Sequence, residues 1–212
     1  MASKSTIDGF DFNKFYEFED PFATRPFRLR TAPESKKLSV EDVYALAHGR
    51  LRLDSPIKLV ASSGGQATDF LWSELPPLVC ISSRVVDLLT TNDCTGWSTY
   101  PVEVYDRQGN LLPGYHGFVV TGPECRRDKS RSEIVEKPPP APRGRSYKVY
   151  KGLYFDEHCW DGSDFFWVVP FGGRIISEKV YRLFRKHKVR NIELTPLLDV
   201  EIKVLFDEFE KP

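Results

Sequence analysis

The chain has 212 residues, a formal net charge of zero at pH 7 and a hydrophobic share of 41%. These values are typical of an ordinary globular protein of one domain, or of one domain with an extension. The balanced charge gives no reason to expect nucleic acid or an anionic membrane as the main partner. No apolar run is long enough to span a bilayer, and the first residues lack the apolar core of a signal peptide, so we expect a cytoplasmic location.

The N-terminal region is rich in aromatic and charged side chains. Residues 15–19 alternate in the manner of a strand. Ser39 opens a predicted helix with capping-box spacing, and Gly49 ends it. The apolar face of this helix is predicted to contain Val40, Val43, Tyr44 and Ala47. We therefore assign residues 1–55 to a strand and helix extension that packs on a core formed by residues 56–212.

One short pattern occurs twice in the core, 95 residues apart and without a gap between the copies. The copies, residues 78–105 and 174–198, share Ile, Ser, Val, Leu and Pro at identical spacing. Each copy predicts a strand, a helix and a second strand. Ser82 and Ser177 stand at the expected N-caps, and an apolar stripe at i, i+3 and i+4 follows each of them. We interpret the pattern as one supersecondary unit used twice.

Between the copies, residues 106–110 predict a hairpin turn with a return strand at 115–121. The segment Pro123–Arg145 is rich in proline and polar residues, which fit neither a helix nor a central strand. We therefore predict an exposed loop there that is mobile at its tip. Further strands are expected at 147–155 and 164–169. Short helices among strands and hairpins predict an α+β fold with a mixed or mainly antiparallel sheet.

The densest group of reactive side chains lies at residues 156–164 and includes carboxylates, His158 and Cys159. Adjacent residues on an extended segment point to opposite faces, and no second His or Cys stands at ligand spacing. The four cysteines form no CxxC pair, which excludes a zinc knuckle and a redox motif. Because no enzyme motif is present either, we predict no metal, no cofactor and no catalytic residue. An enzyme of unknown reaction with a site near His158 and Cys159 stays an alternative.

The helix of the second copy, within residues 177–190, is strongly basic, whereas the helix of the first copy carries one arginine, Arg84. Its basic residues are Arg182, Arg185, Lys186, Lys188 and Arg190. Cations near a helix C-terminus are favoured by the helix dipole, and a solvated basic face is common. Without interleaved aromatic residues, this helix is a weak nucleic-acid signal. A nucleic-acid binder that uses helix 177–190 is a second alternative.

Several short stretches of the core resemble the immunity-protein family of myxobacterial polymorphic-toxin systems. They are Val79–Leu89, Gly96-Trp97, Tyr100–Val102, Asp106–Asn110, Leu112–Tyr115 and Ile176–Val180. The resemblance covers residues 56–198. It implies a bacterial α+β protein, not an enzyme, that binds and neutralises a cognate toxin made by the same cell. It brings no catalytic residues, because the matching positions are caps, core and turns.

Tight neutralisation of a toxin requires an interface of about 1,500 Å² with aromatic and charged anchors. The acidic and aromatic strand at 16–20 and the loop at 156–164 are the segments best suited to supply them. The candidate interface residues are Tyr16, Glu17, Glu19, Asp20, Asp156, Glu157, His158, Trp160, Asp161 and Asp164. We expect replacement of Trp160 and Asp161 by alanine to weaken toxin binding without unfolding the protein.

Overall fold

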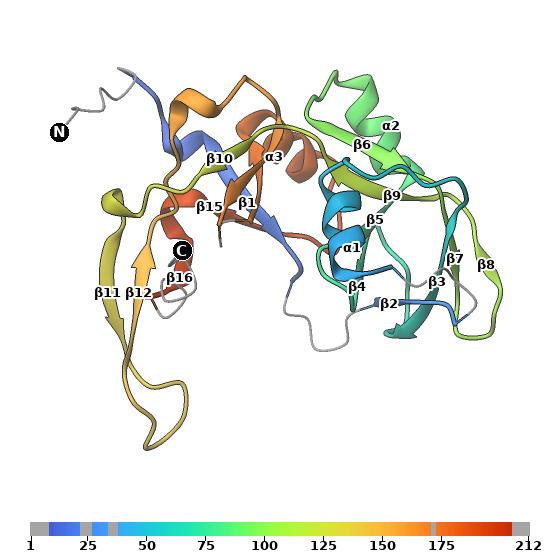
Figure 1. Ribbon diagram of the computed structural model, residues 1–212, viewed down its shortest axis with the longest axis horizontal. Coiled ribbons are helices and arrows are strands. Elements are labelled where there is room, and N and C mark those ends of the chain that lie inside the picture. The colour runs from blue at the N-terminus through green and yellow to red at the C-terminus, as the bar shows by residue number, and fades with distance from the viewer. Residues whose placement is uncertain (1–8, 22–26, 34–37, 171–172, 205–212) are drawn as a thin grey trace. The chain divides into compact units, whose positions relative to one another are not determined.

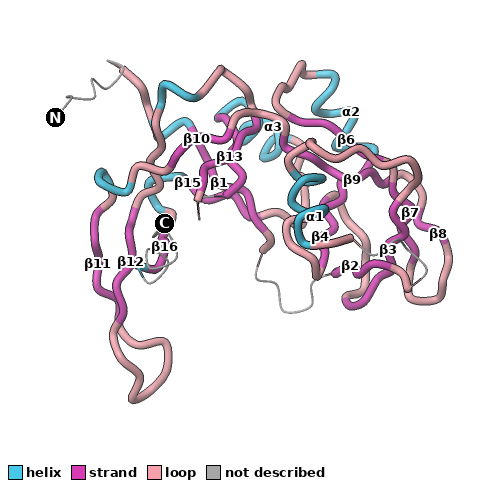
Figure 2. The backbone as a smooth tube through the Cα atoms, in the orientation of Figure 1, coloured by secondary structure: helices cyan, strands magenta, loops and turns pink. Residues whose placement is uncertain are grey.

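The computed structural model describes residues 9–21, 27–33, 38–170 and 173–204. Three α-helices, four short 3₁₀ helices and sixteen strands in three sheets occur in this part of the chain. The predicted α+β fold with mixed sheets and short helices is confirmed (Figures 1 and 2). No helix among the described residues is long and apolar enough to cross a membrane.

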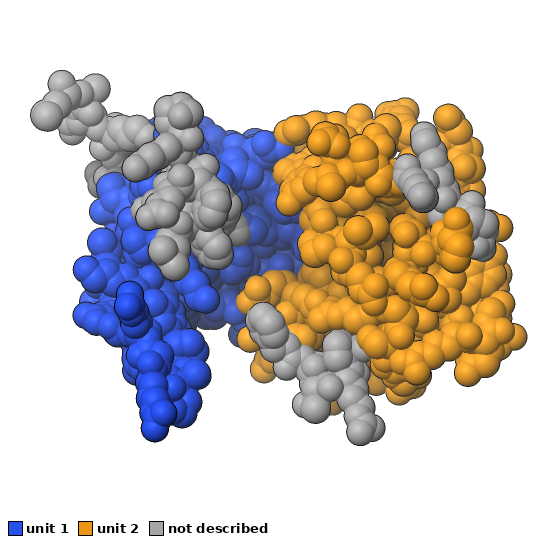
Figure 3. Space-filling model, turned by 60° about the horizontal axis from the view of Figure 1, so that its bottom comes forward, with its two compact units in different colours: residues 1–18, 122–181, 194–212 blue, residues 19–121, 182–193 orange. Residues whose placement is uncertain are grey.

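The chain forms two compact units, and each of them draws on separate stretches of sequence (Figure 3). Unit 1 contains Met1–Phe18, Gly122–Tyr181 and Leu194–Pro212, and unit 2 contains Glu19–Thr121 and Arg182–Glu193. These bounds differ from the predicted extension at 1–55 and core at 56–212. The N-terminal strand and the first helix, which we expected to share the extension, lie in different units.

Unit 2 is built on an eight-stranded sheet with the order β6-β9-β5-β4-β2-β3-β7-β8. Its strands are β2 (Arg28–Thr31), β3 (Ile57–Ser63), β4 (Phe70–Ser73), β5 (Val79–Ser82), β6 (Trp97–Tyr100), β7 (Val102–Tyr105), β8 (Leu111–Leu112) and β9 (Tyr115–Val120). Its complete helices are α1 (Val40–Ala47) and α2 (Ser83–Thr91). Leu59, Leu71 and Cys80 lie in the core of this unit and are almost fully buried.

Helix α1 begins as the sequence predicts, but it buries a different face. Ser39 Oγ accepts a hydrogen bond from Asp42 N, and Asp42 Oδ2 accepts one from Ser39 N, both at 3.0 Å. The predicted apolar face is wrong for Val40 and Tyr44, which are 69% and 53% exposed. The buried residues are Val43, Leu46 and Ala47. These buried residues follow i, i+3 and i+4 spacing that starts at Val43. Val40 and Tyr44 project from the side of this buried stripe toward solvent.

Unit 1 holds a five-stranded sheet with the order β10-β13-β14-β1-β15 and a three-stranded sheet with the order β11-β12-β16. The strands are β1 (Phe15–Glu19), β10 (Glu124–Arg126), β11 (Glu133–Lys137), β12 (Tyr147–Lys151), β13 (Phe165–Val169), β14 (Gly173–Ser177), β15 (Glu193–Pro196) and β16 (Glu201–Lys203). Helix α3 (Glu178–Lys186) follows β14. Phe155, Phe166 and Ile175 are fully buried in the core of this unit.

The turn at 106–110 forms as predicted, but its return strand is not the predicted one. Asp106 Oδ1 accepts hydrogen bonds from Gln108 N and Asn110 N at 2.9 and 2.8 Å. The strand that pairs with β7 after this turn is β8. Residues 115–120 form β9 instead, and β9 pairs with β5 and β6. The predicted return strand at 115–121 is therefore wrong.

The segment Pro123–Arg145 is not an exposed loop throughout, as was predicted. It contains β10, which pairs in parallel with β13 and buries Cys125. It also contains β11, which pairs with β12 over five residues. Four prolines interrupt strand pairing only at 138–142, so the exposed loop is limited to residues 138–146.

The two copies of the repeat fold in the same register, and the repeat is longer than predicted. Strand β4 pairs with β5 through Phe70 and Ile81, and β13 pairs with β14 through Phe165 and Ile176, each 95 residues later. In both copies a further strand joins in parallel, β2 beside β4 and β10 beside β13. The predicted order of strand, helix and strand is confirmed by β5-α2-β6 and β14-α3-β15.

The eight-stranded sheet, which holds the first copy, also contains β9, the strand just before the second copy along the chain. The five-stranded sheet, which holds the second copy, contains β1, the strand just before the first copy. Strand β9 leads into β10 of unit 1, yet it pairs with β5 of unit 2, with Tyr115 opposite Ser82. Strand β1 leads into β2 of unit 2, yet it pairs with β14 of unit 1, with Phe15 opposite Ser177. The two copies therefore exchange their first strands.

Candidate functional site

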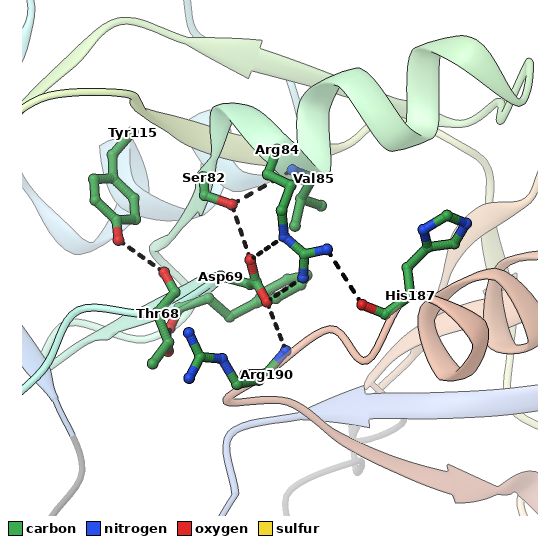
Figure 4. A network of polar contacts seen from close by, with 9 residues as sticks. Thr68, Asp69, Ser82, Arg84, Val85, Tyr115, His187 and Arg190 are labelled. Carbon is green, nitrogen blue, oxygen red and sulfur yellow. Dashed lines mark hydrogen bonds and ion pairs between the residues drawn. The ribbon is translucent and has the colours of Figure 1, made fainter.

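A buried carboxylate lies directly before β4 and collects polar contacts from three segments of unit 2 (Figure 4). Asp69 is 6% exposed. Its Oδ1 accepts hydrogen bonds from Ser82 Oγ at 3.2 Å and from Arg84 Nε at 3.0 Å. Its Oδ2 accepts hydrogen bonds from Arg84 Nη2 at 2.7 Å and from Arg190 N at 2.9 Å. We name this arrangement the Asp69 cluster.

The local fold explains why these residues meet. Strands β4 and β5 are antiparallel neighbours, so the residue before β4 lies opposite the residue that ends β5, and Ser82 N donates to Asp69 O at 2.9 Å. Ser82 also caps α2, because its Oγ accepts a hydrogen bond from Val85 N at 3.4 Å. Arg84 stands in the first turn of α2 and reaches back to the carboxylate.

The Asp69 carboxylate is held in its ionised form. Burial raises the pKa of Asp69, but the hydrogen bonds from Arg84 and Arg190 N outweigh this effect, and the net pKa is lowered. The same hydrogen bond raises the pKa of Arg84. A carboxylate with a lowered pKa and bonds to both oxygens is a poor general base at neutral pH. Its evident effect is to hold β4, β5 and α2 together.

The same cluster anchors the segment after α3. Arg84 Nη1 donates to His187 O at 3.2 Å, and Phe70 N donates to Arg190 O at 3.3 Å. Asn191 Nδ2 donates to the carbonyl oxygen of Phe70 at 2.6 Å, and its own carbonyl accepts the Trp72 indole N–H at 2.7 Å. Asn191 has a φ of 62°, a left-handed conformation that asparagine tolerates better than most residues.

A second cluster of the same design lies in unit 1. Asp164 precedes β13 and is 7% exposed. Its Oδ1 accepts a hydrogen bond from Ser177 Oγ at 2.6 Å, and its Oδ2 accepts one from Lys179 Nζ at 3.1 Å. Ser177 N donates to Asp164 O at 2.9 Å. The three residues follow those of the Asp69 cluster at the repeat spacing of 95 residues, and we name them the Asp164 cluster.

The sequence prediction missed this pair of clusters, although a signal for them is present. The repeat was traced from residue 78 onward, but its register continues ten residues further back. Thr68–Trp72 and Ser163–Trp167 share a hydroxyl residue, Asp, Phe and Trp in the same order. Asp164 is a candidate only as part of an acidic loop, and Asp69 is not among the candidate residues. Extending the register toward the N-terminus identifies both.

The structure places the residues of the 156–164 segment in different environments, and most of them are not exposed. Glu157 is 6% exposed and accepts a hydrogen bond from Arg131 Nη1 at 3.3 Å. The Trp160 ring packs edge-on against Phe15 at 5.1 Å, and its indole N–H donates to Ser163 O at 2.9 Å. The exposed residues of the segment are His158, Asp161 and Gly162.

A disulfide explains why this segment turns inward. Cys159 is bonded to Cys125 of β10, with the two Cα atoms 5.5 Å apart. In this state Cys159 has no thiol to act as a nucleophile. His158 Nδ1 lies 3.2 Å from Asp156 Oδ1 at the surface. The remaining cysteines, Cys80 and Cys94, are buried free thiols, and burial raises the pKa of Cys80 to about 12.

The candidate residues at 16–20 are half-buried. Strand β1 lies between β14 and β15, so both of its edges are paired. The Tyr16 ring stacks on that of Tyr181 at 3.8 Å. Burial raises the pKa of Glu19, with Glu193 adding to the effect, and Asp20 forms an ion pair with Arg28. Glu17 lies beside Gly173, where a Cβ atom would meet its carboxylate.

One further pair of reactive side chains comes together in unit 2. Ser83 Oγ lies 3.0 Å from His116 Nε2 and 3.2 Å from Gly114 O. Within the described residues no carboxylate is hydrogen-bonded to His116, so an acid that would orient the imidazole is absent there. The sequence analysis could not find this pair, because the two residues stand 33 positions apart and match no motif.

The described part of the chain contains no group of three or more His, Cys, Asp or Glu residues that could hold a metal ion. No known protein-family model and no curated protein sequence matches this chain.

Proposed function

We propose that this protein is an immunity-like binding protein that neutralises a cognate bacterial toxin by direct contact. One observation carries the proposal. The two buried carboxylates of the repeat are each matched to a cation, with Asp69 held by Arg84 and Asp164 held by Lys179. Such groups stabilise a scaffold rather than turn over a substrate, which leaves the exposed surface to carry function.

The resemblance to immunity proteins agrees with this assignment. The residues that carry it form strand β5, the Ser82 cap, helix α2 and the turn at 106–110. They are scaffold elements, as expected of a binding protein whose contact surface varies with its partner. Neutralisation would proceed by steric occlusion of the toxin, for which about 1,500 Å² of interface is needed.

The toxin would be met in the cytoplasm of the cell that makes both proteins. Reducing systems keep most cytoplasmic thiols free. A cytoplasmic location therefore requires the Cys125–Cys159 bond to resist reduction, and Cys125 is fully buried. Alkylation of rapidly lysed cells followed by mass measurement gives the state of this pair in the cell.

The proposed function predicts that a neighbouring gene encodes a toxin-like protein. A calorimetric titration of the 212-residue protein with the toxin domain of that gene product tests the proposed function. We expect saturable binding and protection of cells that express both proteins. Absence of binding at micromolar concentrations would contradict the proposal. The interface variant should change exposed residues of the 156–164 segment. The double replacement His158→Glu with Asp161→Lys meets this condition. Trp160→Ala is unsuitable, because it removes a packed aromatic ring and costs about 3 kcal/mol of stability or more.

A nucleic-acid binder is the first alternative function. It is favoured by Arg185 and Lys186, which are exposed on α3. It predicts retention of duplex DNA or RNA that falls steeply as salt is raised, and loss of retention in Arg185→Glu with Lys186→Glu. Retention that is equal in wild type and this variant would remove the alternative.

An enzyme is the second alternative function, and Ser83 with His116 replaces His158 with Cys159 as its candidate site. The disulfide occupies Cys159, whereas the Ser83 hydroxyl lies within hydrogen-bond distance of the His116 imidazole. A serine nucleophile of this kind would react with a fluorophosphonate probe, and Ser83→Ala would abolish the labelling. Labelling that persists in Ser83→Ala, or that never occurs, counts against this alternative.

A further inference from the structure

The hairpin formed by β11 and β12 extends from unit 1 as a narrow arm (Figure 1). Its strands are antiparallel, from Glu133 opposite Lys151 to Lys137 opposite Tyr147. Residues 138–146 join them, and every residue of this connection is exposed. A hairpin can be closed by two residues, so strand pairing alone does not account for a connection of this length. We name residues 133–151 the arm and residues 138–146 its tip.

The tip has internal order although it packs on no core. Gly144 N donates to Ala141 O at 3.0 Å, and Ser146 Oγ donates to Glu136 Oε1 at 2.5 Å. Four of the five residues at 138–142 are prolines, which restrict the backbone before any partner binds. A segment that is restricted in advance loses less conformational entropy on association. The tip therefore has the properties of a prepared contact element.

The charge of the tip is of one sign. Residues 138–146 contain two cationic side chains, Arg143 and Arg145, and no carboxylate. Lys137, the last residue of β11, forms an ion pair with Glu201 Oε1 of β16 at 2.5 Å. Within the described residues, Arg143 and Arg145 have no salt-bridge partner. Both guanidinium groups are thus available to carboxylates on another molecule, with which arginine forms paired hydrogen bonds.

The side of the arm offers a second kind of contact. Strand β11 is at the outer edge of its sheet, which has the order β11-β12-β16. An edge strand can pair with an extended segment of a partner. Ile134 on this strand is 57% exposed, and Tyr150 stands opposite it on β12. Apolar and aromatic surface beside a charged tip is typical of protein interfaces.

We propose that the arm is a docking element whose tip inserts Arg143 and Arg145 into an acidic cleft of the toxin. This inference rests on the proposed function and adds the chemistry of the partner surface. A protein partner is favoured over nucleic acid for two reasons. The chain as a whole has no net charge, and the arm combines its cations with exposed apolar surface at Ile134.

The test compares three full-length proteins, namely wild type, the arm variant Arg143→Glu with Arg145→Glu, and the matched control Arg185→Glu with Lys186→Glu. The control reverses the same amount of charge on exposed residues of α3. The toxin domain encoded beside the gene is titrated into each protein by calorimetry. We expect the arm variant to bind at least about tenfold more weakly, and the control to change by less than about twofold. Thermal melting should coincide for wild type and the arm variant, because the exchanged residues are exposed. The control should melt slightly lower, because it places two anions at the C-terminus of α3.

Two results would overturn the inference while leaving the proposed function standing. One is equal affinity of wild type and the arm variant for the toxin domain. The other is an arm variant that keeps its toxin affinity but loses retention of a duplex DNA of about 20 base pairs, which would make the arm a nucleic-acid element. If wild type itself does not bind the toxin domain, the proposed function fails and the inference falls with it.

Discussion

The two carboxylate clusters occupy the same position in the two copies of the repeat, but they use different cations. Arg84 reaches both oxygens of Asp69 with two nitrogens, whereas Lys179 reaches Oδ2 of Asp164 with a single ammonium group. A planar guanidinium fixes a carboxylate in two directions, and an ammonium group acts as a point charge. Both copies thus place a buried Asp, a Ser and a cation at this point, and only the type of cation differs.

The copies also differ in how they secure the strand beside β4 or β13. In unit 2 the position is filled by Leu29 of β2, and in unit 1 the equivalent position is Cys125 of β10. Leu29 is fully buried in an apolar cluster, whereas Cys125 is buried and bonded to Cys159. Cys125 also belongs to the apolar core of unit 1, so unit 1 adds a covalent link to the apolar packing that unit 2 uses alone at this position.

The largest expected effect comes from removing the covalent link. Cys125→Ala with Cys159→Ala opens a loop with a sequence separation of 34 residues and should lower the free energy of unfolding of unit 1 by about 4 kcal/mol. Urea unfolding monitored by tryptophan fluorescence measures the loss. A reducing agent in the urea solutions should reduce the bond in the unfolded chain, and should thereby bring wild type to the value of the variant and leave the variant unchanged. A variant as stable as wild type would contradict the covalent role.

Removal of either buried carboxylate should produce the next largest effect. Asp69→Ala and Asp164→Ala each leave a cation and a serine hydroxyl without their acceptor, which should cost about 3 kcal/mol. Asp161→Ala, the replacement of an exposed aspartate, is the control and should change stability by less than about 0.5 kcal/mol. Chemical denaturation gives all three values. A loss of stability in only one of the two variants, Asp69→Ala or Asp164→Ala, would contradict the equivalence of the two clusters.

Exchange of the cations tests the difference between the clusters directly. Arg84→Lys removes one of the two approaches to Asp69 and should cost about 1 kcal/mol. Lys179→Arg offers Asp164 a second approach and should change stability by less than about 0.5 kcal/mol, because the partly exposed cation adds little. The same denaturation experiment measures both. An equal loss in the two variants would show that the local packing, and not the cation, sets the difference.

The smallest of the expected effects is the contribution of the Asp69 cluster to the pH dependence of stability. The folded-state pKa of Asp69 is lowered below its ordinary value of 3.8. Its contribution is therefore complete above that value and is lost as pH falls through the lower folded-state pKa. Wild type and Asp69→Asn should accordingly converge in stability between neutral pH and strong acid. Unfolding curves at a series of pH values measure the difference, and a constant gap would contradict ionisation of Asp69 as its source.

Local features of this fold are predictable from sequence because their causes are local. The capping box at Ser39, the Ser82 cap and the turn at 106–110 each depend on residues within four positions of one another. The repeat is also visible, because a fixed spacing of 95 residues preserves its pattern. These features account for the α+β class and for the order of strand, helix and strand in each copy.

The remaining features depend on residues that are distant in the sequence. Because consecutive strands usually pair, the sequence predicts that residues 115–121 form the return strand of the nearest hairpin. In the structure β9 pairs instead with β5 and β6. Four cysteines allow three pairings, and spacing alone does not select the bond between Cys125 and Cys159. Asp69 looks like any acidic residue before a strand until the matching Asp164 is compared with it.

Under the proposed function, the buried clusters are structural and exposed surface binds the toxin. The most direct test is the affinity of Asp69→Asn for the toxin domain, measured by calorimetry at a temperature at which circular dichroism shows the variant to be folded. The account predicts an affinity within about twofold of wild type, together with a clear loss of stability. A folded variant that no longer binds would place Asp69 in the functional site and contradict the claim.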